Sequence, residues 1–129
     1  MSDLQQPCPC GTRTSYDACC GGLHRGAAQA ATPEELMRSR YAAYAVGGSE
    51  GEAYLFRTWH PRSRPDDVST DPGLTWTRLD VLAAEDDWVE FAAHYEFGGV
   101  ARVLHERSRF EQRAGRWVYS GAITSNERR

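Results

Sequence analysis

Hydrophobic and polar residues alternate along the second half of the chain. Between positions 88 and 97, Val89, Phe91, Ala93 and Tyr95 occupy every second position, with polar residues at most of the intervening ones. A period of two is typical of a strand with one buried face. A Gly-Gly pair follows, and such a pair favours a two-residue hairpin turn. The same criteria predict strands over residues 75–84, 88–97, 100–112 and 117–123.

The first half has hydrophobic residues at helical spacing instead. Thr32 is a suitable N-cap, Pro33 is favoured at the first helical position, and Glu35 completes a capping box. We predict a helix from there to about Val46, ended by a Gly-Gly pair. A second, shorter helix is predicted over residues 50–58, ahead of a loop rich in proline, aspartate and serine.

Two helices followed by four long alternating strands predict an α+β domain. We expect a strongly curved antiparallel sheet that wraps around the first helix. The 129 residues suffice for one main domain with its own core, and 40% of them are hydrophobic. No apolar run approaches the ~20 residues that a membrane-spanning helix needs.

All four cysteines lie within the first twenty residues, as Cys8, Cys10, Cys19 and Cys20. Four thiolates can saturate one tetrahedral metal ion. Disulfides or reactive thiols are the alternatives, although the adjacent Cys19 and Cys20 can bridge each other only with strain. The N-terminal residues are polar and show no secretory signal. This predicts a cytoplasmic, reducing location, in which metal binding is commoner than disulfide formation.

Zinc is the ion that we predict for this cysteine cluster. Four cysteines would close its coordination shell, whereas a catalytic zinc keeps one position open for water. His24 follows the last cysteine by four positions and is either a spare ligand or, more in keeping with four thiols, a residue beside the site or on the surface. We predict a zinc knuckle over residues 1–25, then a linker of small residues, and an α+β domain within residues 26–129.

Several short motifs resemble known families. The segments Cys8-Pro9-Cys10-Gly11, Ser15-Tyr16 and Cys19-Cys20-Gly21 resemble the SEC-C motif, a zinc knuckle also found at the C-terminus of the translocation ATPase SecA. Further segments resemble the YchJ-like family of bacterial proteins, and together they span about half of the chain. These segments are Leu23-His24, Leu36-Met37-Arg38-Ser39-Arg40-Tyr41, Ala43-Tyr44 and Thr58-Trp59-His60-Pro61.

The resemblance implies that the four cysteines are the zinc ligands. It also implies the cone-shaped fold of nuclear transport factor 2 and ketosteroid isomerase. One segment departs from the family pattern: Gly11-Thr12-Arg13-Thr14 stands where the family usually has Gly-Ser-Gly-Lys. Any role of that lysine is therefore absent from this chain.

A cone of this class often leaves a pocket between helix and sheet, which can bind a small molecule or host acid–base chemistry. Glu106 is expected to point inward and is either a general base or a buried carboxylate paired with Arg38 or Arg40. His60 is either a catalytic group or a residue that caps the second helix or packs beside it, and we favour the cap or packing role. No catalytic residue is assigned. The pocket candidates are Tyr41, Tyr44, Trp59, His60, Glu106, Ser108, Trp117 and Tyr119.

The net charge of −3 gives no general electrostatic attraction to nucleic acid, and all 15 basic residues are arginines, which excludes lysine-based chemistry. We therefore predict a zinc-binding cytoplasmic adaptor that docks to a protein partner. The SEC-C resemblance implies that the ribosome or the translocation or quality-control machinery supplies this partner. The alternative is a small-molecule-binding protein or enzyme that uses the cone pocket. A deep pocket with Glu106 at its floor would favour the alternative, and a filled core would count against it.

Overall fold

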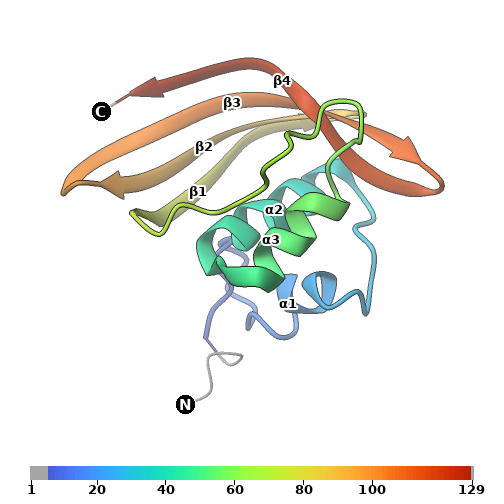
Figure 1. Ribbon diagram of the computed structural model, residues 1–129, viewed down its shortest axis with the longest axis horizontal. Helices are drawn as coiled ribbons and strands as arrows, with labels where there is room; N and C mark the ends of the chain where they lie inside the picture. The colour runs from blue at the N-terminus through green and yellow to red at the C-terminus, as the bar shows by residue number, and fades with distance from the viewer. Residues whose placement is uncertain (1–5, 129) are drawn as a thin grey trace.

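A four-stranded antiparallel sheet arches over a layer of helices (Figure 1). The computed structural model describes the backbone of residues 6–128 and the side chains of residues 6–124. The strands pair in chain order, so the sheet is a simple meander. The elements are α1 (Cys20–His24), α2 (Pro33–Val46), α3 (Gly48–Arg57), β1 (Leu74–Glu85), β2 (Trp88–Phe97), β3 (Val100–Arg113) and β4 (Arg116–Arg128).

The central helix α2 begins and ends where its capping residues predict. Thr32 Oγ1 accepts a hydrogen bond from the backbone nitrogen of Glu35 at 3.1 Å, and Gly47 ends the helix with a φ of 69°. The Glu35 carboxylate accepts from the nitrogen of Ala31, one residue earlier than an ideal capping box requires. None of the described helices has both the length and the apolar character to cross a membrane.

Helix α3 crosses α2 at close range because Gly51 has no side chain. A Cβ at this position would stand 2.5 Å from the carbonyl oxygen of Ala43 on α2. Helix α3 starts at Gly48, two residues earlier than predicted, so that Gly47 alone separates the two helices.

The sheet is regular in its middle and irregular at both edges. Strands β2 and β3 pair without interruption from Trp88↔Arg109 to Phe97↔Val100. The β1–β2 and β3–β4 ladders each contain two register shifts. Bulges of this kind bend strands and increase twist, which accounts for the curvature of the sheet over α2 (Figure 1). The predicted α+β fold with a curved antiparallel sheet is thus confirmed.

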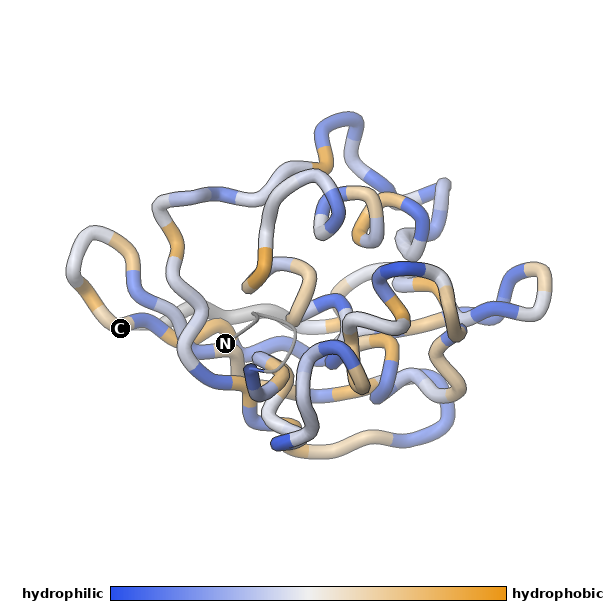
Figure 2. Tube along the Cα trace, turned by 90° about the horizontal axis from the view of Figure 1, so that it is seen from below, coloured by the Kyte–Doolittle hydropathy of each residue, from blue (hydrophilic) through white to orange (hydrophobic). Residues whose placement is uncertain are grey.

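The inner face of the sheet and the helices form the hydrophobic core. Along β2, Val89, Phe91, Ala93 and Tyr95 are buried, as the alternation predicts. Figure 2 shows hydrophobic and hydrophilic residues interspersed along the whole chain rather than gathered in one segment. The most completely buried large side chains of this core are Leu36, Leu55, Val89 and Phe110.

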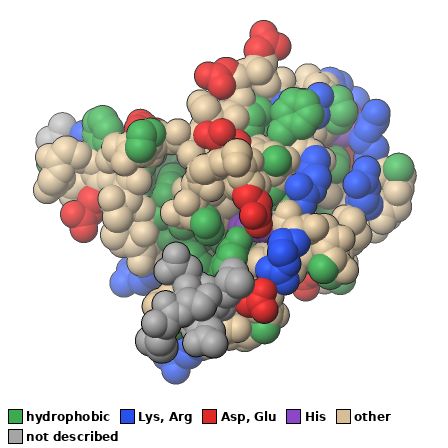
Figure 3. All heavy atoms as spheres, turned by 60° about the horizontal axis from the view of Figure 1, so that its bottom comes forward, with side chains coloured by type: hydrophobic (Ala, Val, Ile, Leu, Met, Phe, Trp, Pro, Cys, Tyr) green, Lys and Arg blue, Asp and Glu red, His purple; other side chains and the backbone are tan. Residues whose placement is uncertain are grey.

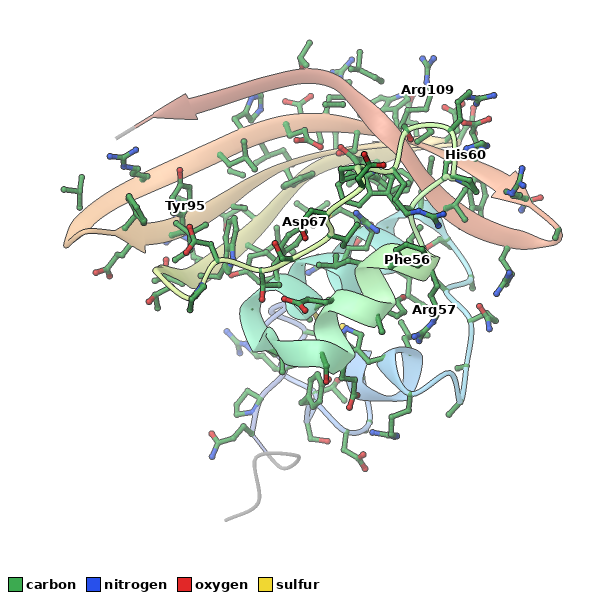
Figure 4. All side chains as sticks on the ribbon, in the orientation of Figure 1. Phe56, Arg57, His60, Asp67, Tyr95 and Arg109 are labelled. Carbon is green, nitrogen blue, oxygen red and sulfur yellow. The ribbon has the colours of Figure 1, made fainter. Side chains whose placement is uncertain are left out.

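The outer face of the sheet carries charged residues. Glu90 on β2 pairs with Arg107 and His105 on β3, at 2.8 Å and 2.9 Å. Arg109 points away from the helices (Figure 4). The sequence alternation likewise places these charged residues on the face of the sheet that contacts solvent. Strand β4, by contrast, is longer than the predicted 117–123, since it pairs with β3 as far as Val103↔Arg128.

Candidate functional site: a cysteine cluster and a cavity under the sheet

The four cysteine sulfurs converge on one point. All four Sγ atoms lie within 4.8 Å of one another, and the Cys10–Cys19 and Cys19–Cys20 sulfur pairs are 3.7 Å and 3.9 Å apart. A tetrahedral ion with metal–thiolate bonds of about 2.3 Å separates its sulfurs by about 3.8 Å. A disulfide requires about 2 Å. The spacing therefore suits four ligands of one metal ion, and the cysteines are not joined in pairs.

A tight loop places the first two cysteines. The backbone nitrogen of Cys8 donates to the carbonyl oxygen of Thr14 at 2.8 Å, and that of Gly11 donates to the carbonyl oxygen of Cys8 at 3.2 Å. Gly11 and Arg13 have φ angles of 91° and 68°, and the first of these is a conformation that glycine adopts without strain. The loop turns back on itself, so that Cys8 and Cys10 are buried together.

A second turn places the adjacent cysteines. The carbonyl oxygen of Tyr16 accepts hydrogen bonds from the backbone nitrogens of Cys19 and Gly21, at 3.1 Å and 2.8 Å. A Cβ on Gly21 would stand 2.7 Å from the same oxygen. Glycine is therefore required directly after Cys20, where α1 begins.

Crowding among the thiols shifts their acidity. A hydrogen bond to Cys10, together with burial, raises the pKa of the Cys8 thiol to about 11. Hydrogen bonds to Cys10 and Cys8 and burial raise the pKa of Cys20, whereas the thiols of Cys20 and Cys8 lower the pKa of Cys10. Without an ion, the cluster keeps protons that a bound dication would replace.

Threonine and histidine side chains support the cluster from outside. Thr12 Oγ1 lies 3.2 Å from the sulfur of the half-buried Cys19. His24 is buried, and its Nε2 lies 2.9 Å from the carbonyl oxygen of Ser39, which can only accept. Nε2 therefore carries the proton, and Nδ1 accepts from the Tyr16 hydroxyl at 2.6 Å. Burial lowers the pKa of His24 and favours this neutral form. Both ring nitrogens are engaged, so His24 is neither a spare ligand nor a surface residue.

The cysteine-bearing segment packs directly on the helices. Arg38 of α2 donates to the carbonyl oxygen of Cys10 at 2.7 Å. Arg57 of α3 donates to the carbonyl oxygens of Leu23 and His24, at 3.0 Å and 2.7 Å. Leu23 also belongs to the main hydrophobic core. Residues on the two sides of the predicted boundary at residue 25 thus contact each other. That the two segments fold independently stays a prediction.

A cavity of about 400 Å³ lies between α2 and the inner face of the sheet. A recess with hydrophobic side chains in it is visible on the helix-bearing face (Figure 3). The cavity wall is formed by Met37, Arg40, Tyr41, Tyr44, Trp59, Leu74, Trp76, Phe91, Ala93, Tyr95, Leu104, Glu106, Ser108, Phe110 and Tyr119. Six of the eight pocket candidates from the sequence are among these residues.

The remaining two candidates, His60 and Trp117, do not line this cavity. His60 is buried in the turn after α3, near β4 (Figure 4), where its Nδ1 accepts from the backbone nitrogen of Arg62 at 3.0 Å. Among the described residues its ring bonds no carbonyl oxygen of α3, and Thr58 bonds that of Tyr54, so His60 has the packing role rather than that of a cap. Trp117 lines a small separate crevice beside α1 and α3.

Glu106 forms a polar cluster on the sheet side of the cavity. Its Oε2 accepts hydrogen bonds from the Ser108 hydroxyl and, at 3.0 Å, from the Tyr119 hydroxyl. Within the described part of the chain, no ion pair joins Glu106 to Arg38 or Arg40. The pairing considered from the sequence is therefore wrong. Arg38 instead pairs with Glu34 at 3.0 Å.

Arg40 is the charged wall residue that the sequence pattern did not assign to the cavity. It is 6% exposed, and its Nη1 donates to the carbonyl oxygen of Leu55 at 3.0 Å and to Thr58 Oγ1 at 2.8 Å. Its guanidinium lies 4.8 Å and 4.7 Å from the ring centres of Trp59 and Tyr119. The sequence did indicate that Arg40 is buried, since it follows Leu36 at helical spacing on the buried side of α2.

Comparison with known proteins places both parts of this site in a family. The family model described as "YchJ, middle NTF2-like domain" matches residues 32–122. UPF0225 proteins of Streptomyces coelicolor and Deinococcus radiodurans are 49% and 48% identical to the chain. The first alignment covers 88% of this chain and 92% of its relative, and the second covers 91% and 88%.

One similar solved structure is the solution structure of a SEC-C motif containing protein from Rhodopseudomonas palustris. It is 35% identical, has a TM-score of 0.79, and is matched over 94% of this chain and 100% of its own. The chain thus combines an N-terminal cysteine cluster with an α+β domain like that of nuclear transport factor 2, and it belongs to the YchJ-like family.

Proposed function

We propose that Cys8, Cys10, Cys19 and Cys20 bind one zinc ion, and that this ion fixes the N-terminal knuckle as a protein-docking surface in the cytoplasm. The observation that carries the proposal is the separation of the sulfurs, which suits the edges of a zinc–thiolate tetrahedron. Four thiolates leave no coordination position for water, so the ion has a structural role.

Thiolate-only tetrahedral sites bind zinc or iron, and metal analysis distinguishes these ions. We expect about one zinc per chain in reduced protein by elemental analysis. Cobalt added to metal-free protein should give the absorption bands of a tetrahedral thiolate complex, and zinc should remove them. Iron in place of zinc, or no metal in reduced protein, would refute the proposal.

The shape of the knuckle supports a docking role. The loop residues between its cysteine pairs, Gly11 to Thr14, are exposed, although the cysteines that anchor them are largely buried. The knuckle also borders an open groove of about 600 Å³, whose walls include Thr12, Cys19 and Glu35. A rigid exposed loop loses little conformational entropy when it binds, which favours recognition of a partner.

The partner is proposed to belong to the ribosome or to the translocation machinery, as the SEC-C motif implies. Pull-down from a bacterial lysate with the zinc-loaded chain tests this. We expect an Arg13→Glu variant to lose ribosomal or translocation partners while it retains zinc, because Arg13 lies on the exposed loop and binds no ion. Arg109→Glu, on the outer face of the sheet, is the matched control (Figure 4).

The Cys8→Ser/Cys10→Ser variant provides a second arm of the same experiment. It removes two ligands, so it should lose both zinc and the partners. If the same proteins are recovered with the wild-type chain and with this variant, the knuckle is not the docking surface.

A further inference from the structure

The cavity beneath the sheet has the size of a ligand site. Its volume of about 400 Å³ falls within the range of ~300–1,000 Å³ that is typical of small-molecule pockets. Protein interiors are otherwise close-packed, with few voids larger than a water molecule. Leu36, Leu55 and Val89 show that this chain packs its core to full burial elsewhere. The chain therefore leaves the space between α2 and the sheet open in a fold that is otherwise well packed.

Four aromatic rings form a contiguous part of the cavity wall. Trp76 of β1 lies at their centre, with ring-centre distances of 5.8 Å to Tyr41, 6.1 Å to Tyr44 and 5.1 Å to Tyr95. Flat, rigid rings of this kind contact a planar ligand over a large area at little cost in side-chain entropy. The wall therefore suits an aromatic or alicyclic ring.

One oriented acceptor lies at the sheet side of the cavity. The hydroxyl protons of Ser108 and Tyr119 both point to Oε2 of Glu106, so these two groups have no proton left to offer a ligand. Oε1 of the same carboxylate takes neither bond. The polar end of the cavity thus offers an acceptor, which requires a donor such as a hydroxyl or an N–H on the ligand.

The charges of the wall favour a neutral ligand. Arg40 and Glu106 both line the cavity, and among the described residues Arg40 has no carboxylate within ion-pair distance. Its guanidinium is held by the Trp59 and Tyr119 rings and by neutral oxygens. An anion would be attracted by Arg40 but repelled by Glu106, and a cation the reverse. The two opposite charges therefore give no net preference for a charged ligand, which would also lose its hydration on entering the cavity.

We propose that the cavity binds one small, neutral ring compound whose hydroxyl or N–H group donates a hydrogen bond to Oε1 of Glu106. This binding function is separate from the proposed docking role of the knuckle, and no cysteine lines the cavity.

Three matched probes test the proposal on the full zinc-loaded chain. 2-Naphthol carries a ring and a hydroxyl donor, naphthalene lacks the donor, and 2-naphthoate is anionic. Titration followed by amide chemical shifts should show saturable binding of 2-naphthol at cavity residues of α2, β2 and β3. Naphthalene should bind about tenfold more weakly, because it leaves the buried acceptor unpaired. 2-Naphthoate should bind most weakly.

Two substitutions make the test specific. Glu106→Leu should reduce the preference for 2-naphthol over naphthalene from about tenfold towards unity. Ala93→Phe places a ring in the cavity and should abolish binding of both compounds. Ala92→Phe, one residue earlier on the outer face of β2, should leave binding unchanged. If Glu106→Leu does not fold by circular dichroism, Glu106→Ala replaces it, since alanine also removes the acceptor. If Ala93→Phe does not fold, Leu104→Trp replaces it.

Four results would overturn the proposal. They are the absence of saturable shifts with 2-naphthol, equal affinity for 2-naphthol and naphthalene in the wild type, tighter binding of 2-naphthoate, and unchanged binding when the cavity is filled.

Discussion

Gly21 lies directly after Cys20, at the point where the chain turns into α1. A Cβ there would stand 2.7 Å from the carbonyl oxygen of Tyr16, which itself accepts the two hydrogen bonds of the turn. The oxygen cannot retreat without releasing the turn that brings Cys19 and Cys20 to the cluster. Gly22 has no such constraint, because its Cβ would lie 3.9 Å from the nearest atom, the carbonyl oxygen of Asp17.

We therefore expect Gly21→Ala to weaken zinc binding by about tenfold or more, the loss typical of a disturbed support around a metal site. Gly22→Ala should bind zinc as the wild type does. Competition with a chromophoric chelator measures both affinities. Equal affinities for the two variants would show that the Tyr16 turn does not position the cysteines.

Individual residues differ in whether their roles can be predicted from the sequence. The cysteine spacing and the Thr32 cap depend on neighbours within a few positions, and both were predicted. The roles of His24 and Arg40 were not. Their partners, the carbonyl oxygens of Ser39 and Leu55, are 15 residues away, and tertiary packing brings them together. Long-range partners of this kind have no local signature in the chain.

At the scale of helices and strands, tertiary pairing and packing produce some elements and bounds that the local sequence pattern does not predict. Helix α2 has strong capping signals at both ends, and its predicted bounds are confirmed. Helix α1 was missed because two of its five residues are glycines, which disfavour helix in isolation. The end of β4 has no hydrophobic alternation, and its pairing with β3 maintains the strand.

The β2–β3 pair carries a pH-sensitive contribution to stability. Glu90 accepts hydrogen bonds from Arg107 at 2.8 Å and 3.2 Å and lies 2.9 Å from Nε2 of His105. The bonds from Arg107, and then from His105, hold the pKa of Glu90 below its ordinary value. A carboxylate whose pKa is depressed on folding stabilises the protein above the unfolded pKa of about 4.3. This stabilisation is lost as the pH falls through the folded value.

Glu90→Gln should therefore lower the urea midpoint relative to wild type at about pH 6, and the difference should shrink towards about pH 3. Glu96→Gln on the same strand is the control, because Glu96 is exposed at the end of β2. Its midpoint should follow that of the wild type throughout. If the difference in urea midpoint between Glu90→Gln and wild type does not depend on pH, the loss of stability comes from lost packing and not from the ionised carboxylate of Glu90.

At the scale of the whole molecule, α2 and α3 form a layer between the knuckle, which includes α1, and the sheet (Figure 1). The knuckle is tied to α2 and α3 through Arg38 and Arg57, and the core residues of β2 and β3 lie on the sheet side of these helices. The cysteine cluster buries few hydrophobic groups of its own, among which Ala42 comes from α2. The metal ion is therefore expected to hold the knuckle together, whereas hydrophobic packing holds the sheet and helices.

Removal of zinc tests this division, because structural zinc sites are usually unfolded without their ion. After treatment with a chelator, backbone amides of residues 8–24 should exchange rapidly with solvent, while amides in β2 and β3 remain protected. The melting temperature should also fall, since Leu23 and His24 no longer cover the helices. The Cys8→Ser/Cys10→Ser variant should show the same pattern without chelator and should not respond to its addition. If exchange in β2 and β3 rises together with that of the knuckle, the two segments form one cooperative unit, and the predicted boundary near residue 25 is wrong.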